Sequence, residues 1–128
     1  MKRLLLMAGA MLISVMMFAQ TSGTVTFKVT TSTASGQYAP KHVLAIWVTD
    51  DAGTFQKSLK VMAAVRKQYL YKWKTATPSQ NVTDATTGAT LTSHQTHTVA
   101  WNCKNTSNTV VTDGNYKVWV EFTENDAQ

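Results

Sequence analysis

The residues whose types could support chemistry gather in one polar stretch, 75–96, which is filled with Thr, Ser, Asn and Gly and shows no hydrophobic periodicity. Within it lies the segment Asp84-Ala85-Thr86-Thr87-Gly88-Ala89-Thr90. A hydroxyl group that is to react in the active site of another protein must lie on an exposed and narrow segment. Gly88 and Ala89 keep the backbone narrow, and Gly88 can adopt positive φ where a turn requires it. The alternative is that these small polar residues form only a turn-rich surface segment.

Other chemistry-bearing residues have simpler structural explanations. His94 and His97 have a spacing that could seat a metal ion, yet no third ligand lies close by in the sequence, so we assign no metal site. The alternating aromatic residues of 69–73 could stack on a planar ring, although such spacing is more often ordinary core. Cys103, the only cysteine, is expected to be a small buried hydrophobic residue on a strand, and the sequence assigns it no role.

The sequence patterns of common enzyme classes are missing. The chain has no nucleophile elbow and no glycine-rich nucleotide loop. Its seven acidic residues include no convincing general acid and base pair. We therefore do not expect the domain to be an enzyme.

The start of the chain has the layout of a secretory signal peptide. Lys2 and Arg3 precede the uncharged run Leu4–Ala19, which gives way to polar residues at Gln20. A lone transmembrane helix needs about 20 predominantly apolar residues, so this run is too short for a membrane span. We predict a signal peptide over residues 1–19, cleavage near Gln20, and a periplasmic or secreted protein.

The remaining residues, 20–128, suffice for one modest hydrophobic core and are too few for two domains. The formal charge of +5 falls to +3 once Lys2 and Arg3 leave with the signal peptide, and no basic cluster remains. This pattern argues against a nucleic-acid partner. A single cysteine excludes an intramolecular disulfide, so packing must stabilise the domain.

Hydrophobic periodicity predicts five strands and at most one short helix. The central prediction is 43–48, which is apolar on both faces like an inner strand of a sandwich. Residues 62–73 fit either a helical stripe or a strand face, and we favour a short helix or an irregular crossover. The other predicted strands are 24–30, 55–62, 99–103 and 116–122. The fold class is therefore all-β, an antiparallel β-sandwich.

The polar stretch 75–96 is then a long loop between predicted elements. Loops longer than about 15 residues are uncommon in compact domains and are usually functional or disordered. We therefore treat 75–96 as a functional loop of the single domain 20–128.

Two paired segments resemble a known hairpin. His97–Asn102, a polar connection and Asp113–Val118 resemble the hairpin of the immunoglobulin-like domain of flagellar hook-capping proteins. Together with Val43–Gly53 and Tyr69–Trp73, they make the chain from about Pro40 to Glu124 similar to a family of predicted periplasmic proteins, domain of unknown function 2271. The resemblance implies an immunoglobulin-like sandwich and assigns no activity, because a shared fold does not fix a function.

An immunoglobulin-like sandwich usually has about seven strands, whereas the pattern predicts five. We therefore expect one of two situations. Either the chain is truncated at its C-terminus and lacks the last strands, or a partner supplies them by pairing with an exposed edge.

The segment 84–90 resembles the covalent flavin-attachment motif, Asp-x-x-Ser/Thr-Gly-Ala-Thr/Ser, of FMN-carrying subunits in membrane redox complexes. The resemblance implies that Thr90 is the FMN acceptor and that Asp84, Thr87, Gly88 and Ala89 form the recognition sequence. In those proteins an extracytoplasmic flavin transferase uses FAD and magnesium to join FMN to the last hydroxyl residue. Those subunits bear the motif on a different fold, so only the loop is shared.

The resulting hypothesis is an extracytoplasmic redox carrier domain that bears FMN through Thr90. Its implied partners are a flavin transferase and a membrane-bound redox protein. The alternative is a cofactor-free immunoglobulin-like module for periplasmic binding or assembly. Neither the electron donor and acceptor nor the oligomeric state follows from the sequence.

Overall fold

The computed structural model describes residues 19–125, so the predicted signal peptide lies outside the described residues except for Ala19. Between Val25 and Thr123, the described chain forms six strands and two short helices. The strands are β1 (Val25–Thr30), β2 (Val43–Asp50), β3 (Phe55–Met62), β4 (Thr86–Gly88), β5 (Thr96–Trp101) and β6 (Tyr116–Thr123). The helices are the 3₁₀ helix η1 (Ala64–Tyr69) and the α-helix α1 (Tyr71–Ala76).

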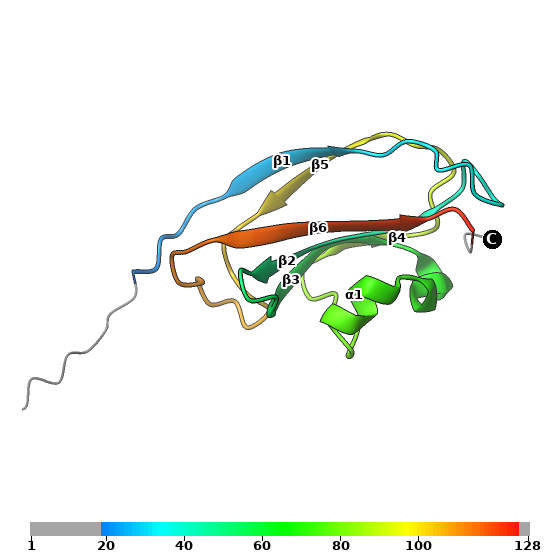
Figure 1. Ribbon diagram of the computed structural model, residues 1–128. Coiled ribbons are helices and arrows are strands. Elements are labelled where there is room, and N and C mark those ends of the chain that lie inside the picture. The colour runs from blue at the N-terminus through cyan, green and yellow to red at the C-terminus, as the bar shows by residue number, and fades with distance from the viewer. Residues whose placement is uncertain (1–18, 126–128) are drawn as a thin grey trace, which may run out of the picture.

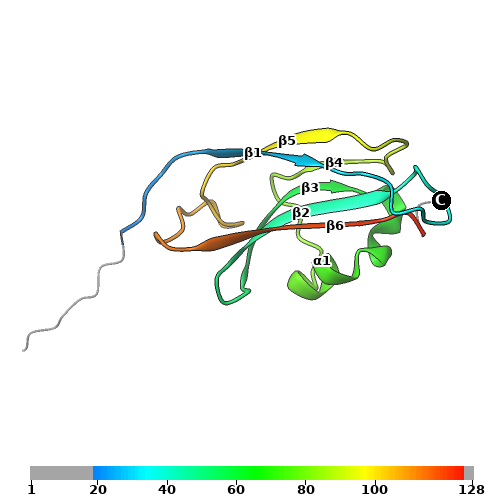
Figure 2. The same cartoon turned by 45° about the horizontal axis from the view of Figure 1, so that its top comes forward.

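The strands form two sheets, which confirms the predicted all-β sandwich. β1 and β5 pair antiparallel as one sheet, and the other sheet has the order β4-β3-β2-β6. The prediction of a wholly antiparallel fold is wrong at β4, which runs parallel to β3. The hairpin expected of His97–Asn102 and Asp113–Val118 is also wrong, because β5 pairs with β1 whereas β6 pairs with β2 in the other sheet. Figures 1 and 2 show the two-stranded sheet on one face of the four-stranded sheet and the helices on the other face.

β2 is the central strand because both of its faces are covered. Every residue from Val43 to Thr49 is buried. Its even-numbered apolar residues face the two-stranded sheet and pack with Val99 and Trp101 of β5. Its odd-numbered ones face the helices. This two-sided burial confirms the central strand predicted from a run that is apolar at consecutive positions.

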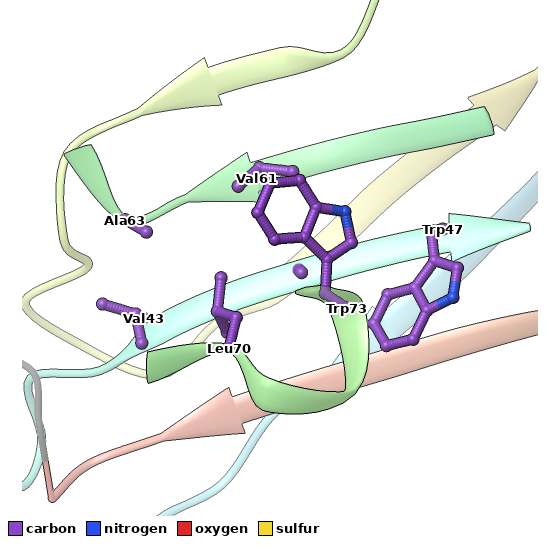
Figure 3. Close-up of a cluster of buried hydrophobic side chains, with 7 residues drawn as sticks. Val43, Trp47, Val61, Ala63, Leu70 and Trp73 are labelled. Carbon is purple, nitrogen blue, oxygen red and sulfur yellow. The ribbon is translucent and has the colours of Figure 1, made fainter. Parts of the chain in front are cut away.

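The helices cover the second face of β2 through a cluster centred on Trp73. Figure 3 shows Leu70 and Trp73 lying over β2 and β3, against Val43, Trp47 and Val61. The indole Nε1 of Trp73 donates a hydrogen bond of 2.9 Å to the Ser58 hydroxyl, which satisfies two buried polar groups at once. The helical alternative for residues 62–73 is therefore confirmed, but the chain forms two short helices where at most one was predicted. Trp73 is a core residue.

Glu121 of β6 fixes the start of α1. Its carboxylate accepts hydrogen bonds of 3.0 Å from the backbone N–H groups of Lys72 and Trp73. These N–H groups belong to the first turn and have no partner within the helix. A side chain 48 residues away in the sequence thus supplies the cap that the local sequence lacks.

Cys103 departs from its prediction. β5 ends at Trp101, and Cys103 has a φ of 59°, which is left-handed backbone rather than strand. The chain turns here because Val111 N donates to Cys103 O at 2.9 Å and Trp101 Nε1 donates to Lys104 O at 2.9 Å. The side chain is partly buried and packs against the core between the sheets. Its expected packing is therefore found, whereas its expected strand is wrong.

Candidate functional site

The segment 84–90 contains a short strand, although the stretch 75–96 was predicted to be a loop. Thr86, Thr87 and Gly88 form β4, which pairs with Lys60, Val61 and Met62 of β3. β-Branched threonines suit extended backbone, and the outer edge of β3 offers unpaired N–H and C=O groups. β4 is therefore the edge of the four-stranded sheet, and Thr86 and Thr87 are exposed on it.

A tight turn leads into β4 and places Asp84 on the surface. Ala85 N donates to Val82 O at 3.0 Å, and Asp84 takes a φ of 59° at the turn. Aspartate is one of the residues that tolerate this left-handed conformation. Val82 anchors the turn by packing against the core beneath the helices. The Asp84 carboxylate is thereby held at a fixed position, with its side chain 63% exposed.

Asp84 lies beside a buried amine that the sequence did not single out. Lys57 Nζ is 3.6 Å from the Asp84 carboxylate, and the Lys57 side chain is only 4% exposed. The amine also lies 3.4 Å from the Asn102 side-chain oxygen. Lys57 is buried because two shifts of register in the β2–β3 pair place consecutive residues of β3 inside. The signal available in the sequence was a lysine near the middle of a predicted strand, 55–62.

Gly88 lies directly under a methionine side chain. A Cβ on Gly88 would be 2.5 Å from the Met62 methyl carbon and 3.1 Å from its sulfur. The Gly88 carbonyl accepts a hydrogen bond of 3.0 Å from Ala63 N. The glycine at position 88 therefore allows the segment to pack closely on the end of β3. Gly88 does not adopt positive φ, so a turn conformation is not the reason for a glycine here.

The two residues after β4 are held between two backbone attachments. Ala89 is exposed and Thr90 is partly buried. Directly after Thr90, Leu91 exchanges backbone hydrogen bonds of 3.0 and 2.9 Å with His42, and its side chain packs into the core between the sheets. The Thr90 hydroxyl is therefore carried by a short link fixed at Gly88 and at Leu91. The expected free loop is instead an anchored segment.

His42 connects this link to a buried group of histidines. His42 stacks on His94 with ring centroids 4.1 Å apart and an angle of 6° between the planes. His42 Nδ1 lies 2.9 Å from the Pro40 carbonyl, so this nitrogen must carry the proton and Nε2 is left as an acceptor. No partner for the buried Nε2 lies among the described residues. Burial lowers the pKa of His42, and nearby His94 lowers it further, so His42 is neutral.

His97 is the other fully buried histidine. Lys60 Nζ lies 2.9 Å from His97 Nδ1, and an ammonium group can only donate, so His97 carries its proton on Nε2. Burial lowers the pKa of His97, and the positive charge of Lys60 lowers it further. The spacing His-x-x-His thus separates the two side chains, because His94 turns to Thr31 and Glu124 instead. Within residues 19–125 no group of three candidate ligands could hold a metal ion.

Glu124 ties the histidine group to the loop after β1. Its carboxylate lies 2.8 Å from His94 Nε2 and accepts hydrogen bonds from Thr33 Oγ1 and from the backbone N–H groups of Ala34 and Gly36. The hydrogen bond with His94 is the main cause that lowers the pKa of Glu124 to about 2, and the backbone N–H groups add to it. Glu124 is 2% exposed and ionised at neutral pH.

The fold therefore places every predicted site residue on one anchored segment, 84–90, at the β4 edge. The sequence did not indicate that Met62, Lys57 and His42 support this segment, since each is distant from it in the sequence. The aromatic side chains of 69–73 do not form one surface on which a planar ring could stack, because Trp73 is buried and Tyr71 is 63% exposed. None of the helices in the described part is long and apolar enough to cross a membrane.

The fold defines the class of protein as a β-sandwich domain with an exposed segment at one sheet edge. The chain belongs to the family described as Predicted periplasmic protein (DUF2271), whose family model matches residues 24–128. This family membership confirms the predicted periplasmic localisation. Searches of curated proteins and of solved structures gave no match.

Proposed function

We propose that this domain is a periplasmic redox carrier that bears FMN on Thr90. The observation that carries the proposal is that the motif 84–90 contains β4, the free edge of the four-stranded sheet, and that Thr90 lies two residues beyond the end of this strand. Edge strands offer unpaired backbone groups, and enzymes commonly bind extended peptides through such groups. The exposed Thr87 and Asp84 side chains are then available to a flavin transferase.

The attachment reaction is a phosphoryl transfer without oxidation or reduction. The Thr90 hydroxyl oxygen forms a bond to the phosphorus on the FMN side of FAD, the bond to AMP breaks, and the hydroxyl proton passes to a base of the transferase. Magnesium held by the transferase offsets the charge of the diphosphate. Once attached, the flavin ring supplies the electron-transfer chemistry. The domain contributes position, because Gly88 and Leu91 fix the link on both sides of Thr90.

The decisive experiment is the intact mass of the mature protein after periplasmic co-expression with a flavin transferase. One added FMN-sized mass is expected, together with flavin fluorescence in a denaturing gel. Thr90→Ala should abolish the adduct because alanine has no nucleophilic oxygen, and Thr90→Ser should keep part of it. Thr92→Ala is the matched control, since Thr92 is an exposed threonine two residues further on, and it should be modified normally.

An unchanged mass under co-expression, or an adduct that persists in Thr90→Ala, contradicts the proposal. The cofactor-free binding or assembly module would then be favoured. The observation in its favour is the exposed apolar strand β6, at the opposite edge of the same sheet. Colour separates the two functions, because protein with an attached flavin is yellow and protein without one is colourless.

A further inference from the structure

β6 exposes apolar side chains on both of its faces. Val118 and Val120 are 44% and 42% exposed on the face toward the two-stranded sheet, and Trp119 is 40% exposed on the helix face. The two-stranded sheet packs on β2 and on the two ends of β6, at Tyr116 and Phe122, but leaves the two valines between them exposed. Long apolar edge strands are uncommon in soluble proteins because they pair with other chains.

The edge of β6 also has neither a proline nor a bulge, two features that commonly prevent such pairing. β6 is the last strand in its sheet, and it pairs with β2 over eight consecutive residues without a shift of register. The strand contains no proline, and no other strand within residues 19–125 pairs with its outer edge. A regular strand of this length is a template for one more strand.

We propose that the outer edge of β6 pairs antiparallel with β6 of a second copy of this chain. Trp119 lies on the two-fold axis and faces Trp119 of the second copy. In this register Lys117 lies opposite Glu121 of the second copy, and Glu121 lies opposite its Lys117. Val118 lies opposite Val120, and Tyr116 lies opposite Phe122. Such a two-fold contact uses the same surface on both copies.

Charge complementarity selects this register. Both oppositely charged pairs form only when Trp119 is central, because a shift by two residues in either direction moves Lys117 away from Glu121. A shift by one residue would place the helix-covered face of one copy on the same side of the joined sheet as the opposite face of the other copy. Opposite charges across a strand pair are favourable and like charges are not. The Glu121 carboxylate keeps lone pairs for this contact while it caps α1.

The dimer would be one continuous sheet of eight strands with a copy of β4 at each outer end. The segments 84–90 are then farthest from the contact and stay open to a transferase. The pairing is therefore independent of the proposed flavin attachment, and each can fail without the other.

Sedimentation equilibrium of the purified mature protein over a concentration series tests the pairing. We expect twice the chain mass at high concentration. Val118→Lys places a charge opposite Val120 and should raise the dimer dissociation constant at least tenfold. Val65→Lys is the matched control, because Val65 is 83% exposed on η1 away from the edge, and it should leave the constant unchanged. A monomer at every concentration, or a dimer unaffected by Val118→Lys, overturns the proposal.

Cysteine cross-linking tests the register with milder substitutions. In a Cys103→Ser background, Val118→Cys and Val120→Cys are purified separately, then mixed and oxidised. The mixture should give a disulfide-linked dimer, since these positions lie opposite each other, whereas each variant alone should cross-link several-fold less. Equal cross-linking of a single variant with itself overturns the register. Native mass spectra that show a different protein on the edge in place of a second copy overturn the choice of partner.

Discussion

The Met62 side chain covers Gly88 so closely that a Cβ at position 88 would lie 2.5 Å from the Met62 methyl carbon. Gly88→Ala therefore requires Met62 to move. Overpacking of this kind typically costs about 1–3 kcal/mol, and we expect the lower end because a methionine end is flexible. Urea unfolding of the two single variants and the double variant Gly88→Ala/Met62→Ala measures the coupling. The alanine at position 88 should cost much less when Met62 is already Ala. Equal costs in both backgrounds would show that the contact is unimportant.

The Asp84–Lys57 contact allows recognition by a transferase to be separated from local structure. Asp84→Asn keeps the size of the side chain and removes its charge. Because Asp84 is 63% exposed, we expect the free energy of unfolding to fall by less than about 1 kcal/mol. Under the proposed function the variant should nevertheless lose most of its flavin adduct, as measured by intact mass.

Lys57→Met is the matched control for that experiment. It breaks the ion pair by removing the lysine partner, and it leaves the motif 84–90 intact. The Asp84 carboxylate that loses its partner is 63% exposed and stays solvated, so the variant should remain folded. We expect normal flavin attachment in this variant. If Lys57→Met lost the adduct as fully as Asp84→Asn, Asp84 would act by fixing the turn rather than by direct recognition.

Strands were predicted best from the sequence where either one face or both faces of the strand are buried over several residues. β2 was recognisable because apolar residues occupy both of its faces, and β5 because Val99 and Trp101 alternate with polar neighbours. β4 could not be predicted, because three residues are too few for a period to show. β4 pairs with β3 because the edge of β3 is free, and the residues 86–88 alone do not indicate this partner.

The supporting residues of the candidate site were hidden for a related reason. Lys57 and Met62 belong to β3, and His42 precedes β2, so only the tertiary fold brings them to the segment 84–91. Cys103 was misassigned because its alternation with Trp101 continues the strand pattern past the residue at which the chain turns. Tertiary hydrogen bonds override periodicity at such a strand end.

The buried histidines predict a loss of stability in mildly acidic solution. His42 and His97 have pKa values lowered in the folded state, so the unfolded chain binds more protons once the pH falls below about 6.5. Protonation would leave His42 Nε2–H without an acceptor and would place His97 beside the Lys60 cation. The free energy of unfolding should therefore be constant above this pH and decrease below it, with a limiting slope of about 1.4 kcal/mol per pH unit for each histidine.

Urea unfolding at several pH values between 5 and 7.5 measures this slope. His97→Gln should reduce it, because one of the two responsible groups is gone while an amide can still accept from Lys60. An unchanged slope in His97→Gln would assign the pH dependence to other groups.

Glu124 predicts a second, more acidic loss of stability. Its pKa is lowered to about 2 in the folded protein, chiefly by the hydrogen bond with His94, from an ordinary value of 4.5. A lowered carboxyl pKa stabilises the fold fully above the unfolded value, and this stabilisation is lost as the pH falls from about 4.5 toward about 2. Protonation would also weaken the hydrogen bonds from Ala34 and Gly36, so the loop after β1 should open in the same pH range.

Glu124→Gln isolates this effect, because it removes the charge at nearly constant size. The variant should be less stable than the wild-type protein at neutral pH, and the difference should shrink as the pH falls through the window between about 4.5 and about 2. Asp51→Asn, a change at an exposed carboxylate in the β2–β3 turn, is the control and should leave the pH profile parallel to wild type. Hydrogen exchange of the Ala34 and Gly36 amides should be faster in Glu124→Gln at neutral pH. Unchanged exchange at these two amides would show that Glu124 does not hold the loop.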